Sequence, residues 1–383
     1  MKLVFISNYM THHQLPFCLA LEKKLGEEFC FLATDRMEDE RKRMGWEQAK
    51  YPFIREYDDD WDLSHSLTDE SDILICGGTH HSFIEKRLKS GKLTFRYFER
   101  LYKKGRQHAL SPGGYMRKLK EHTAYRNAPV YLMCAGGYVP ADFSMFFSYP
   151  GKMLKWGYFP ATDETEVYGN RDTLKLLWTG RQLEWKHPET AVLAVRELRD
   201  KYGLNTKLTM AGEGEMRGEV ERLIKLYDLS DSIELLPFVK PSEVRRLMKE
   251  AGIYLMTSSY EEGWGAVVNE AMNAGCVCVA SSAAGSVPYL IKDGENGIVY
   301  RYEKDALKNA GKIAAAVSRI NKDREAAERI SAAARETIVK EWNAEHASER
   351  FLEFAEGALA GKQLCYESGP MSAAPLIMPG RWP

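Results

Sequence analysis

Short apolar segments alternate with helix-patterned segments along both halves of the chain, and this alternation restricts the fold more than any other feature. In the second half we predict strands at Leu174–Thr179, Lys207–Ala211, Ile233–Leu236, Ile253–Thr257, Val277–Ala280 and Ile298–Tyr300. In the first half we predict them at Lys2–Ser7, Phe29–Ala33, Asp72–Cys76, Leu93–Phe95 and Val130–Cys134. Such alternation indicates parallel sheets with helices on both faces. We therefore expect an α/β protein with two Rossmann-like domains facing a central cleft, at the carboxyl ends of their strands.

The length of 383 residues agrees with two domains. Gly157, Pro160 and a polar stretch place the boundary within Lys155–Glu166. We expect an N-terminal, acceptor-side domain over 1–158 and a donor domain over 159–345. A long helix is predicted over Thr337–Phe354. The helix end and tail, 346–383, would pack back on the first domain.

The overall charge is balanced, with 53 basic and 54 acidic side chains. This balance argues against a nucleic-acid-binding polycation. The sequence contains no run of 18 apolar residues, so we expect no transmembrane helix. The seven scattered cysteines suggest reduced thiols in a cytoplasmic protein. Cys276-Val277-Cys278 could be a metal or redox pair, but a buried strand is the favoured interpretation.

Charge is concentrated locally in residues 92–155, which carry twelve Lys or Arg and three acids. Five hydrophobic residues follow the basic cluster, at Phe143, Met145, Phe146, Phe147 and Tyr149. Two interpretations stay open. The segment could make peripheral contact with the inner face of a membrane or with a lipid-linked acceptor. Alternatively, the basic residues form a solvated helix face and the aromatic residues beside them belong to the core.

The strongest chemical signal is Glu261–Glu270, in which a Gly-X-Gly turn opens a helix between Glu262 and Glu270. Free amides at a helix start bind phosphate. Eight helical steps separate the two acids by about 12 Å, more than the roughly 5–9.5 Å of glycosidase pairs. This spacing suits the two ends of an extended ligand with a diphosphate between them. A solvated helix face with unrelated acids is the alternative.

Further candidates follow the neighbouring predicted strands. Arg181, after Gly180, and Lys186 supply two cations for a diphosphate, or else form a surface pair. Gly212-Glu213-Gly214 ends the next strand, where a Gly-X-Gly turn can approach a ligand. Phe238-Val239 could frame a base, or else belong to the core.

Taken in order, these motifs resemble the donor domain of GT4-type retaining glycosyltransferases (glycosyl transferases group 1), which have the GT-B fold. The resemblance covers about Leu174–Tyr300 and includes Ala274-Gly275, Gly285 and Asp293–Gly297. The sequence departs from the family pattern at Ala251-Gly252, where the family usually has Asp after Ala. We expect this departure to affect packing rather than chemistry.

The resemblance implies roles for the candidate residues. Arg181 and Lys186 would hold the diphosphate of a UDP or GDP donor, Glu262 would contact the sugar, and Glu270 would bind the ribose. No cofactor or metal is implied. The residues expected to bind the donor are Gly180, Gly212, Gly214, Phe238, Val239, Gly263, Trp264, Gly265, Ala266, Val267 and Glu270.

The first half matches the family less well. Family members place a Gly-rich loop after the first strand and a His near the reacting sugar, but the loop Asn8–Gln14 has no Gly. His80 and His13 are the candidates for that His, and either could instead bind solvent or acceptor. Asp58–Asp62 has the Asp-X-Asp spacing of metal-dependent glycosyltransferases, but its charged surroundings favour a solvated loop.

These observations predict a retaining, metal-independent glycosyltransferase. It would move a sugar from a nucleotide-diphosphate donor to a glycan or polyprenyl-linked acceptor, in cell-surface polysaccharide synthesis. Two alternatives remain. One is another GT-B enzyme, such as a UDP-sugar 2-epimerase or a phosphorylase, and the other is a non-catalytic nucleotide-sugar-binding subunit.

Overall fold

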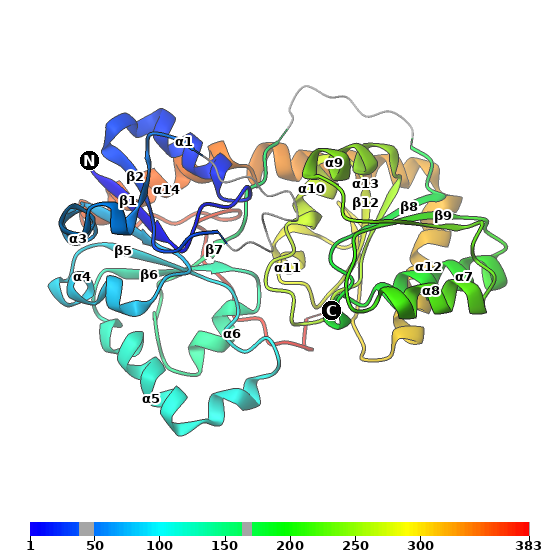
Figure 1. The fold of residues 1–383 in the computed structure, drawn as a ribbon, viewed down its shortest axis with the longest axis horizontal. Coiled ribbons are helices and arrows are strands. Elements are labelled where there is room, and N and C mark those ends of the chain that lie inside the picture. The colour runs from blue at the N-terminus through cyan, green and yellow to red at the C-terminus, as the bar shows by residue number, and fades with distance from the viewer. Residues whose placement is uncertain (38–49, 163–170, 383) are drawn as a thin grey trace. The chain divides into compact units, whose positions relative to one another are not determined.

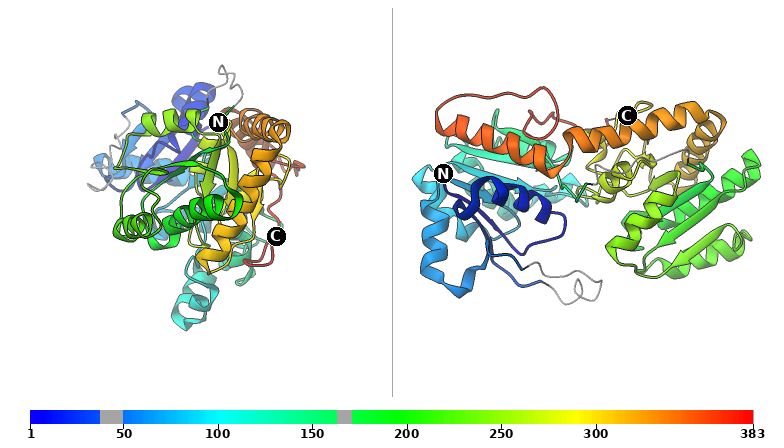
Figure 2. Two further views of the ribbon diagram at one scale, coloured as in Figure 1. Left: turned by 90° about the vertical axis from the view of Figure 1, so that its right-hand side faces the viewer. Right: turned by 90° about the horizontal axis from the view of Figure 1, so that it is seen from above.

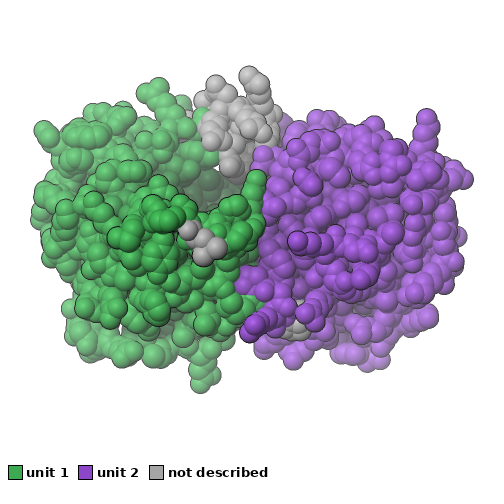
Figure 3. Space-filling model, turned by 90° about the horizontal axis from the view of Figure 1, so that it is seen from below, with its two compact units in different colours: residues 1–161, 341–378 green, residues 162–340, 379–383 purple. Residues whose placement is uncertain are grey.

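The computed structural model describes residues 1–37, 50–162 and 171–382, which form two compact α/β units (Figure 1). Unit 1 contains residues 1–161 and 341–378, and unit 2 contains residues 162–340 and 379–383. Figure 3 colours the two units separately. The predicted fold class, two Rossmann-like domains with parallel sheets, is confirmed.

Unit 1 is built on a parallel sheet whose described strands run in the order β3-β2-β1-β4-β5-β6-β7. The strands are β1 (Leu3–Ser7), β2 (Phe29–Ala33), β3 (Ile54–Glu56), β4 (Ile73–Cys76), β5 (Thr94–Phe98), β6 (Val130–Ala135) and β7 (Met153–Trp156). The strand order reverses between β1 and β4. Ligands of doubly wound sheets bind at the carboxyl ends of the strands flanking such a reversal.

Helices cover the sheet of unit 1 because their apolar residues must be buried against it. They are α1 (Leu15–Leu25), α3 (Trp61–Glu70), α4 (Glu85–Ser90), α6 (Val139–Ser144) and α14 (Ala344–Leu359), whereas α5 (Pro112–Glu121) has no buried residue and contacts the 3-10 turns on either side of it. Although α14 is far from α1 in sequence, the two helices pack together (Figure 2). Phe351 of α14 contacts Phe17 of α1 edge-on, and Lys24 pairs with Glu345 at 3.2 Å.

Unit 2 repeats the architecture, with its described strands in the order β10-β9-β8-β11-β12-β13. They are β8 (Lys175–Thr179), β9 (Lys207–Ala211), β10 (Ile233–Leu236), β11 (Ile253–Met256), β12 (Val277–Ser281) and β13 (Ile298–Tyr300). The order reverses between β8 and β11, which pair directly.

The helices of unit 2 are α7 (Pro188–Tyr202), α8 (Arg217–Leu226), α9 (Pro241–Glu250), α10 (Val267–Asn273), α11 (Val287–Leu290), α12 (Ala306–Lys322) and α13 (Arg324–Glu336). In Figure 1, α7 and α12 pack together on one face of the sheet, and α9 and α10 cover the other. Small side chains such as Ala191, Ala194, Ala310 and Ala314 are fully buried, so α7 and α12 approach closely.

The structure corrects the predicted helix over Thr337–Phe354. A π-helical turn spans Thr337–Glu341, and α14 begins only at Ala344, because Asn343 is extended and caps it by accepting from the His346 amide at 2.9 Å. The prediction also missed β3 and β7, which are short and partly exposed. Residues 163–166 of the predicted boundary lie outside the described residues.

The tail after α14 runs along β7 of unit 1. Ala373 forms an antiparallel bridge with Leu154, and the Lys155 amide donates to the Ser372 carbonyl at 2.7 Å. Further on, the Gly380 amide donates to the Tyr260 hydroxyl at 2.8 Å, within unit 2. The tail is therefore ordered by backbone hydrogen bonds.

Most of the aromatics beside the basic stretch belong to the core. Phe143, Phe146 and Tyr149 are fully buried, and only Phe147 is exposed, at 74%. For these three residues the core interpretation is correct, and a membrane contact through 92–155 stays a prediction. No helix in the described ranges is long and apolar enough to span a bilayer. Six cysteines are buried, including both members of the Cys276–Cys278 pair, and Cys365 is exposed.

Candidate functional site

The predicted donor residues gather where the strand order of unit 2 reverses. The chain leaves β8 through Gly180 and Arg181, and it leaves β11 through Thr257 and Ser258. Because β8 and β11 are parallel neighbours, their following loops meet at one edge of the sheet. Two hydrogen bonds join the loops: the Ser259 amide donates to the Trp185 carbonyl, and the Thr257 hydroxyl donates to the Lys186 carbonyl.

An ion pair between Lys186 and Glu262 lies at this junction. The Lys186 Nζ is 2.7 Å from Glu262 Oε2, and the side chains are only 16% and 10% exposed. The same carboxylate oxygen accepts from the Ser258 hydroxyl at 3.0 Å, and the Lys186 ammonium lies 4.6 Å from the Trp185 ring centroid. The structure thus brings together two residues that are 76 positions apart in sequence.

Glycines allow the ends of β8 and β9 to approach closely. A Cβ on Gly212, where φ is +129°, would lie 2.0 Å from the Gly180 carbonyl oxygen. A Cβ on Gly214 would lie 2.5 Å from the carbonyl oxygen of Gln182, whose fully buried side chain donates to the Gly212 carbonyl at 2.9 Å. The Gly-X-Gly motif therefore shapes the edge of the site.

The turn before α10 leaves backbone donors available. Gly265 has φ +85°, and a Cβ there would meet Met256 at 2.8 Å. Within the described chain, the amides of Gly265, Ala266 and Val267 donate to no protein acceptor. The prediction for Gly263–Val267 concerns their backbone amides, and the side chain of Trp264 is buried, with its indole donating to Asn269. Only its backbone can meet a ligand.

Glu270 is a half-buried carboxyl on α10. Burial raises its pKa to about 7, and the positive charge of Arg245 opposes that shift. A hydroxyl donor placed beside this carboxyl would favour its ionised form.

Other predicted donor residues lie on the surface. Arg181 is exposed, Phe238 is 44% exposed, and Val239 is partly buried, all in loops that follow β8 or β10. The alternative that placed Phe238 in the core is wrong. An exposed aromatic at a strand end can stack on a planar ligand.

Two of the family-like motifs are structural. The Asn296 amide donates to the Leu290 carbonyl and to the Thr337 hydroxyl, both at 2.9 Å, which closes the Asp293–Gly297 turn. A Cβ on Gly252, the point of departure from the family, would lie 2.2 Å from the Asp172 carbonyl oxygen. Close packing therefore requires Gly at that position.

Unit 1 has its own polar cluster at the reversal of its sheet. The Gly78 amide donates to the Ser7 hydroxyl at 3.2 Å, and the Thr79 hydroxyl donates to Thr34 at 3.0 Å. His80 is exposed, and its Nδ1 accepts a hydrogen bond from the Ser82 amide. Nε2 takes no part in this hydrogen bond. The His13 ring is tilted against the rings of His12 and Tyr158, with centroids 3.8 Å and 5.8 Å away.

The Asp-X-Asp segment has a local structural role. Asp60 caps α3, with its carboxylate accepting from the Leu63 amide at 3.0 Å. The prediction of a solvated loop missed this helix start. In the described part of the chain, no group of three or more His, Cys, Asp or Glu side chains is placed to hold a metal ion.

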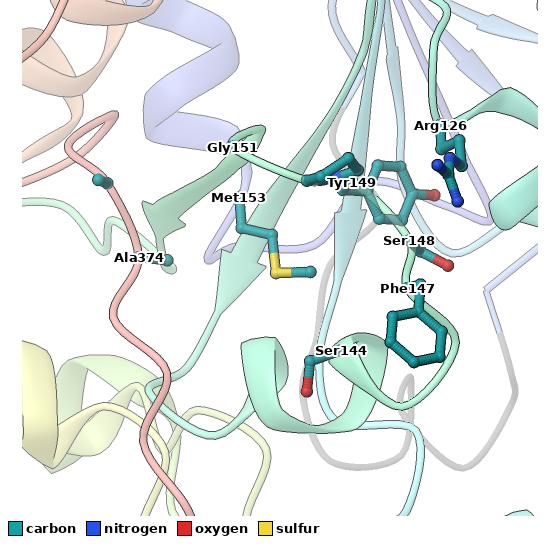
Figure 4. A pocket seen from close by; sticks show the side chains of 10 residues that line it. Arg126, Ser144, Phe147, Ser148, Tyr149, Gly151, Met153 and Ala374 are labelled. Carbon is teal, nitrogen blue, oxygen red and sulfur yellow. The ribbon is translucent and has the colours of Figure 1, made fainter.

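A cavity of about 470 Å³ opens in unit 1 (Figure 4). Met153 begins β7 and Arg126 precedes β6, so the cavity lies at the amino ends of these strands. That edge is opposite to the one bearing His80. Its lining residues are Arg126, Ser144, Phe147, Ser148, Tyr149, Pro150, Gly151, Met153, Ala373 and Ala374.

Sequence reasoning missed Ser258, His187 and Tyr302. Ser258 could have been found, because three hydroxyl residues, Thr257 to Ser259, directly follow a buried strand. His187 and Tyr302 carry no sequence signal, since they meet only through the fold, where the His187 Nε2 lies 2.9 Å from the Tyr302 hydroxyl.

Comparison with known proteins shows what the part of the chain bearing this site is similar to. Residues 163–337 match the model of the family described as glycosyl transferases group 1. An uncharacterised glycosyltransferase of Methanocaldococcus jannaschii is 33% identical over 153 residues, 40% of this chain and 37% of the relative. A putative colanic acid biosynthesis glycosyltransferase of Salmonella typhimurium is 29% identical over 175 residues, 44% of this chain and 42% of the relative. The chain thus spans about two fifths of the length of these relatives.

A solved structure supports the fold over nearly the whole chain. The Anabaena protein HepE, crystallised with UDP and glucose, has a TM-score of 0.67 to this chain at 13% identity, covering 93% of this chain and 100% of HepE. Residues 163–337 are thus similar to glycosyl transferases group 1, and the two Rossmann-like units have the GT-B fold.

Proposed function

We propose that the chain is a GT4-type retaining, metal-independent glycosyltransferase that uses a UDP or GDP sugar. The observation that carries this proposal is the largely buried Lys186–Glu262 pair at the strand reversal of the segment that matches glycosyl transferases group 1. The HepE structures with UDP and with UDP-glucose support a nucleotide-sugar donor. Relatives named for colanic acid and amylovoran biosynthesis support a place in polysaccharide synthesis, and for this we propose a glycan or polyprenyl-linked acceptor.

In this proposal the ion pair changes partners when the donor binds. The diphosphate replaces Glu262 beside Lys186, with Arg181 as the second cation, and the freed carboxylate accepts from hydroxyls of the donor sugar. Amides of Gly265 to Val267 bind the phosphates, Glu270 binds the ribose, and Phe238 and Val239 frame the base. The sugar–phosphate bond breaks through an oxocarbenium-like transition state, and Lys186 stabilises the charge of the leaving diphosphate.

Unit 1 supplies the acceptor side in the proposal, with His80 or His13 near the reacting sugar. The acceptor hydroxyl forms the new bond to the anomeric carbon as the bond to the diphosphate breaks, and its proton goes to the leaving diphosphate. Retention means that this bond forms on the face from which the diphosphate leaves.

Nucleotide binding should depend on pH through Glu270. With a pKa of about 7, the carboxyl is mostly protonated at pH 6 and mostly ionised at pH 8. If the ribose binds the ionised form, affinity for UDP or GDP rises about tenfold across that range. Calorimetric titration measures the effect. Glu270→Gln removes this group, so its residual slope reports the titration of the phosphate alone, and equal slopes in both proteins would refute the assignment.

The proposed function is tested by the chemistry of the purified chain. Thermal-shift screening against nucleoside diphosphates and their sugars identifies the donor, since a ligand at 100-fold its Kd contributes about 2.7 kcal/mol of stability. Product analysis with the identified donor then separates the alternatives. Conversion of the donor without an acceptor would indicate an epimerase, and binding without conversion or transfer would indicate a non-catalytic subunit.

A further inference from the structure

His187 occupies an unusual backbone position directly after Lys186. Its φ of 50° and ψ of 53° are left-handed, a region that residues other than Gly rarely adopt. The residue links the 3-10 turn Glu184–Lys186 to α7, which begins at Pro188. A strained residue persists only where its surroundings hold it in place, and such residues cluster at functional sites.

The surroundings that hold His187 are a carboxylate and a phenol, one on each ring nitrogen. Nδ1 lies 2.8 Å from Glu189 Oε1, and Nε2 lies 2.9 Å from the Tyr302 hydroxyl. Burial and the nearby Glu189 and Glu261 charges raise the pKa of Tyr302 to about 12, so its phenol keeps the proton. Because the Glu189 carboxylate can only accept, it takes the hydrogen bond from Nδ1–H, and Nε2 of the neutral ring then accepts from the Tyr302 hydroxyl, which fixes one tautomer.

Tyr302 continues this chain of contacts to the segment that bears Glu262. Its ring meets the Tyr260 ring edge-on, with centroids 5.7 Å apart and planes at 89°. Tyr260 lies two residues before Glu262. The segments carrying the two members of the ion pair are thus joined by backbone contacts at Trp185 and Lys186 and by the His187–Tyr302–Tyr260 side chains.

We propose that His187, held by Glu189 and Tyr302, is a positioning residue that fixes the Lys186 ammonium and the Glu262 carboxylate for the nucleotide-sugar donor. This inference rests on the proposed function for its catalytic consequence. Gly would adopt the left-handed backbone of position 187 at lower conformational cost than His. The backbone therefore does not require His187, and the bridge that its side chain makes between Glu189 and Tyr302 is needed only for the positioning. Among the described residues, the buried Oε2 of Glu189 also has no hydrogen-bond partner, so the bridge is not optimised for stability.

The test separates the bridge from the backbone. H187G and H187N both tolerate a left-handed backbone, but neither can span Glu189 and Tyr302. Y302F removes only the hydroxyl and keeps the ring against Tyr260. We expect all three to lower kcat about tenfold, to change the donor KM less than twofold, and to leave Tm unchanged or raised. A lowered Tm with unchanged kcat would overturn the proposal, and so would retention of kcat by both His187 variants.

A second readout does not depend on the donor or on turnover. In the ligand-free protein, hydrogen exchange of residues 257–262 should accelerate at least fivefold in H187G and in Y302F. Y202F, at the far end of α7, should leave both exchange and kcat unchanged. If the wild type transfers no sugar, the proposed function fails while faster exchange still supports the bridge. Unchanged exchange in both variants would overturn it.

Discussion

Lys186→Met is expected to lower kcat/KM for glycosyl transfer by at least a hundredfold. The substitution keeps an unbranched chain of similar length and removes the ammonium that would stabilise the leaving diphosphate. Loss of one donor to a developing negative charge typically costs about 2.7–4 kcal/mol in a preorganised site. Steady-state kinetics with the donor identified by thermal shift measures the loss. Most of it should appear in kcat, because the charge develops in the transition state.

The matched control for that variant is Lys225→Met on α8, an exposed lysine of the same unit. It should keep full activity. Lys186→Met also leaves the buried Glu262 carboxylate with the Ser258 hydroxyl, at 3.0 Å, as its one remaining hydrogen-bond partner among the described residues, so the single variant should lose stability. Adding Glu262→Gln should restore stability without restoring activity. Activity within threefold of wild type in Lys186→Met would refute the assigned site.

The strands and site loops of unit 2 could be predicted from the sequence because the features that mark them are local. A buried strand followed by Gly180, or by the Gly-X-Gly turn at Gly212, places its loop at the carboxyl edge wherever the strand lies in a parallel sheet. The strand order then decides which loops meet, and β8 with β11 brings Lys186 to Glu262. Sequence alone did not give that pairing, which depends on contacts between residues far apart in the chain.

Side-chain orientation could not be predicted from these patterns. The role expected of the Gly263–Val267 amides stays a prediction, but the motif does not show that the Trp264 indole is turned into the core toward Asn269. For Phe143 and Phe146 the sequence left two interpretations open, and the structure places both rings in the interior of unit 1. The helix pattern over 337–354 does not reveal where α14 begins. Asn343 can occur within a helix, and only the structure shows that its side chain caps α14.

Unit 1 should depend for its stability on Arg87, whose side chain is fully buried. The guanidinium donates to the carbonyls of Thr68 at 3.1 Å, Ser71 at 2.8 Å and Leu93 at 2.7 Å, and to the Thr94 hydroxyl at 3.1 Å. Burial lowers its pKa to about 10, so it stays charged at neutral pH. The positive charge lies at the carboxyl end of α3, where a helix dipole favours a cation.

Arg87→Met should therefore destabilise unit 1 by about 3–5 kcal/mol, since it leaves several buried carbonyls without a donor. Arg87→Lys should recover only part of this loss, because a single ammonium cannot reach acceptors that a planar guanidinium contacts on different sides. Lys89→Met is the control on the same helix: Lys89 is exposed and its pair with Glu85 is worth at most about 0.5 kcal/mol. Urea unfolding followed by circular dichroism, with each unit's transition fitted separately, measures the three variants. A shift for Arg87→Met no larger than that of Lys89→Met would mean that water replaces the guanidinium at these carbonyls, and the buried side chain would then be a packing element only.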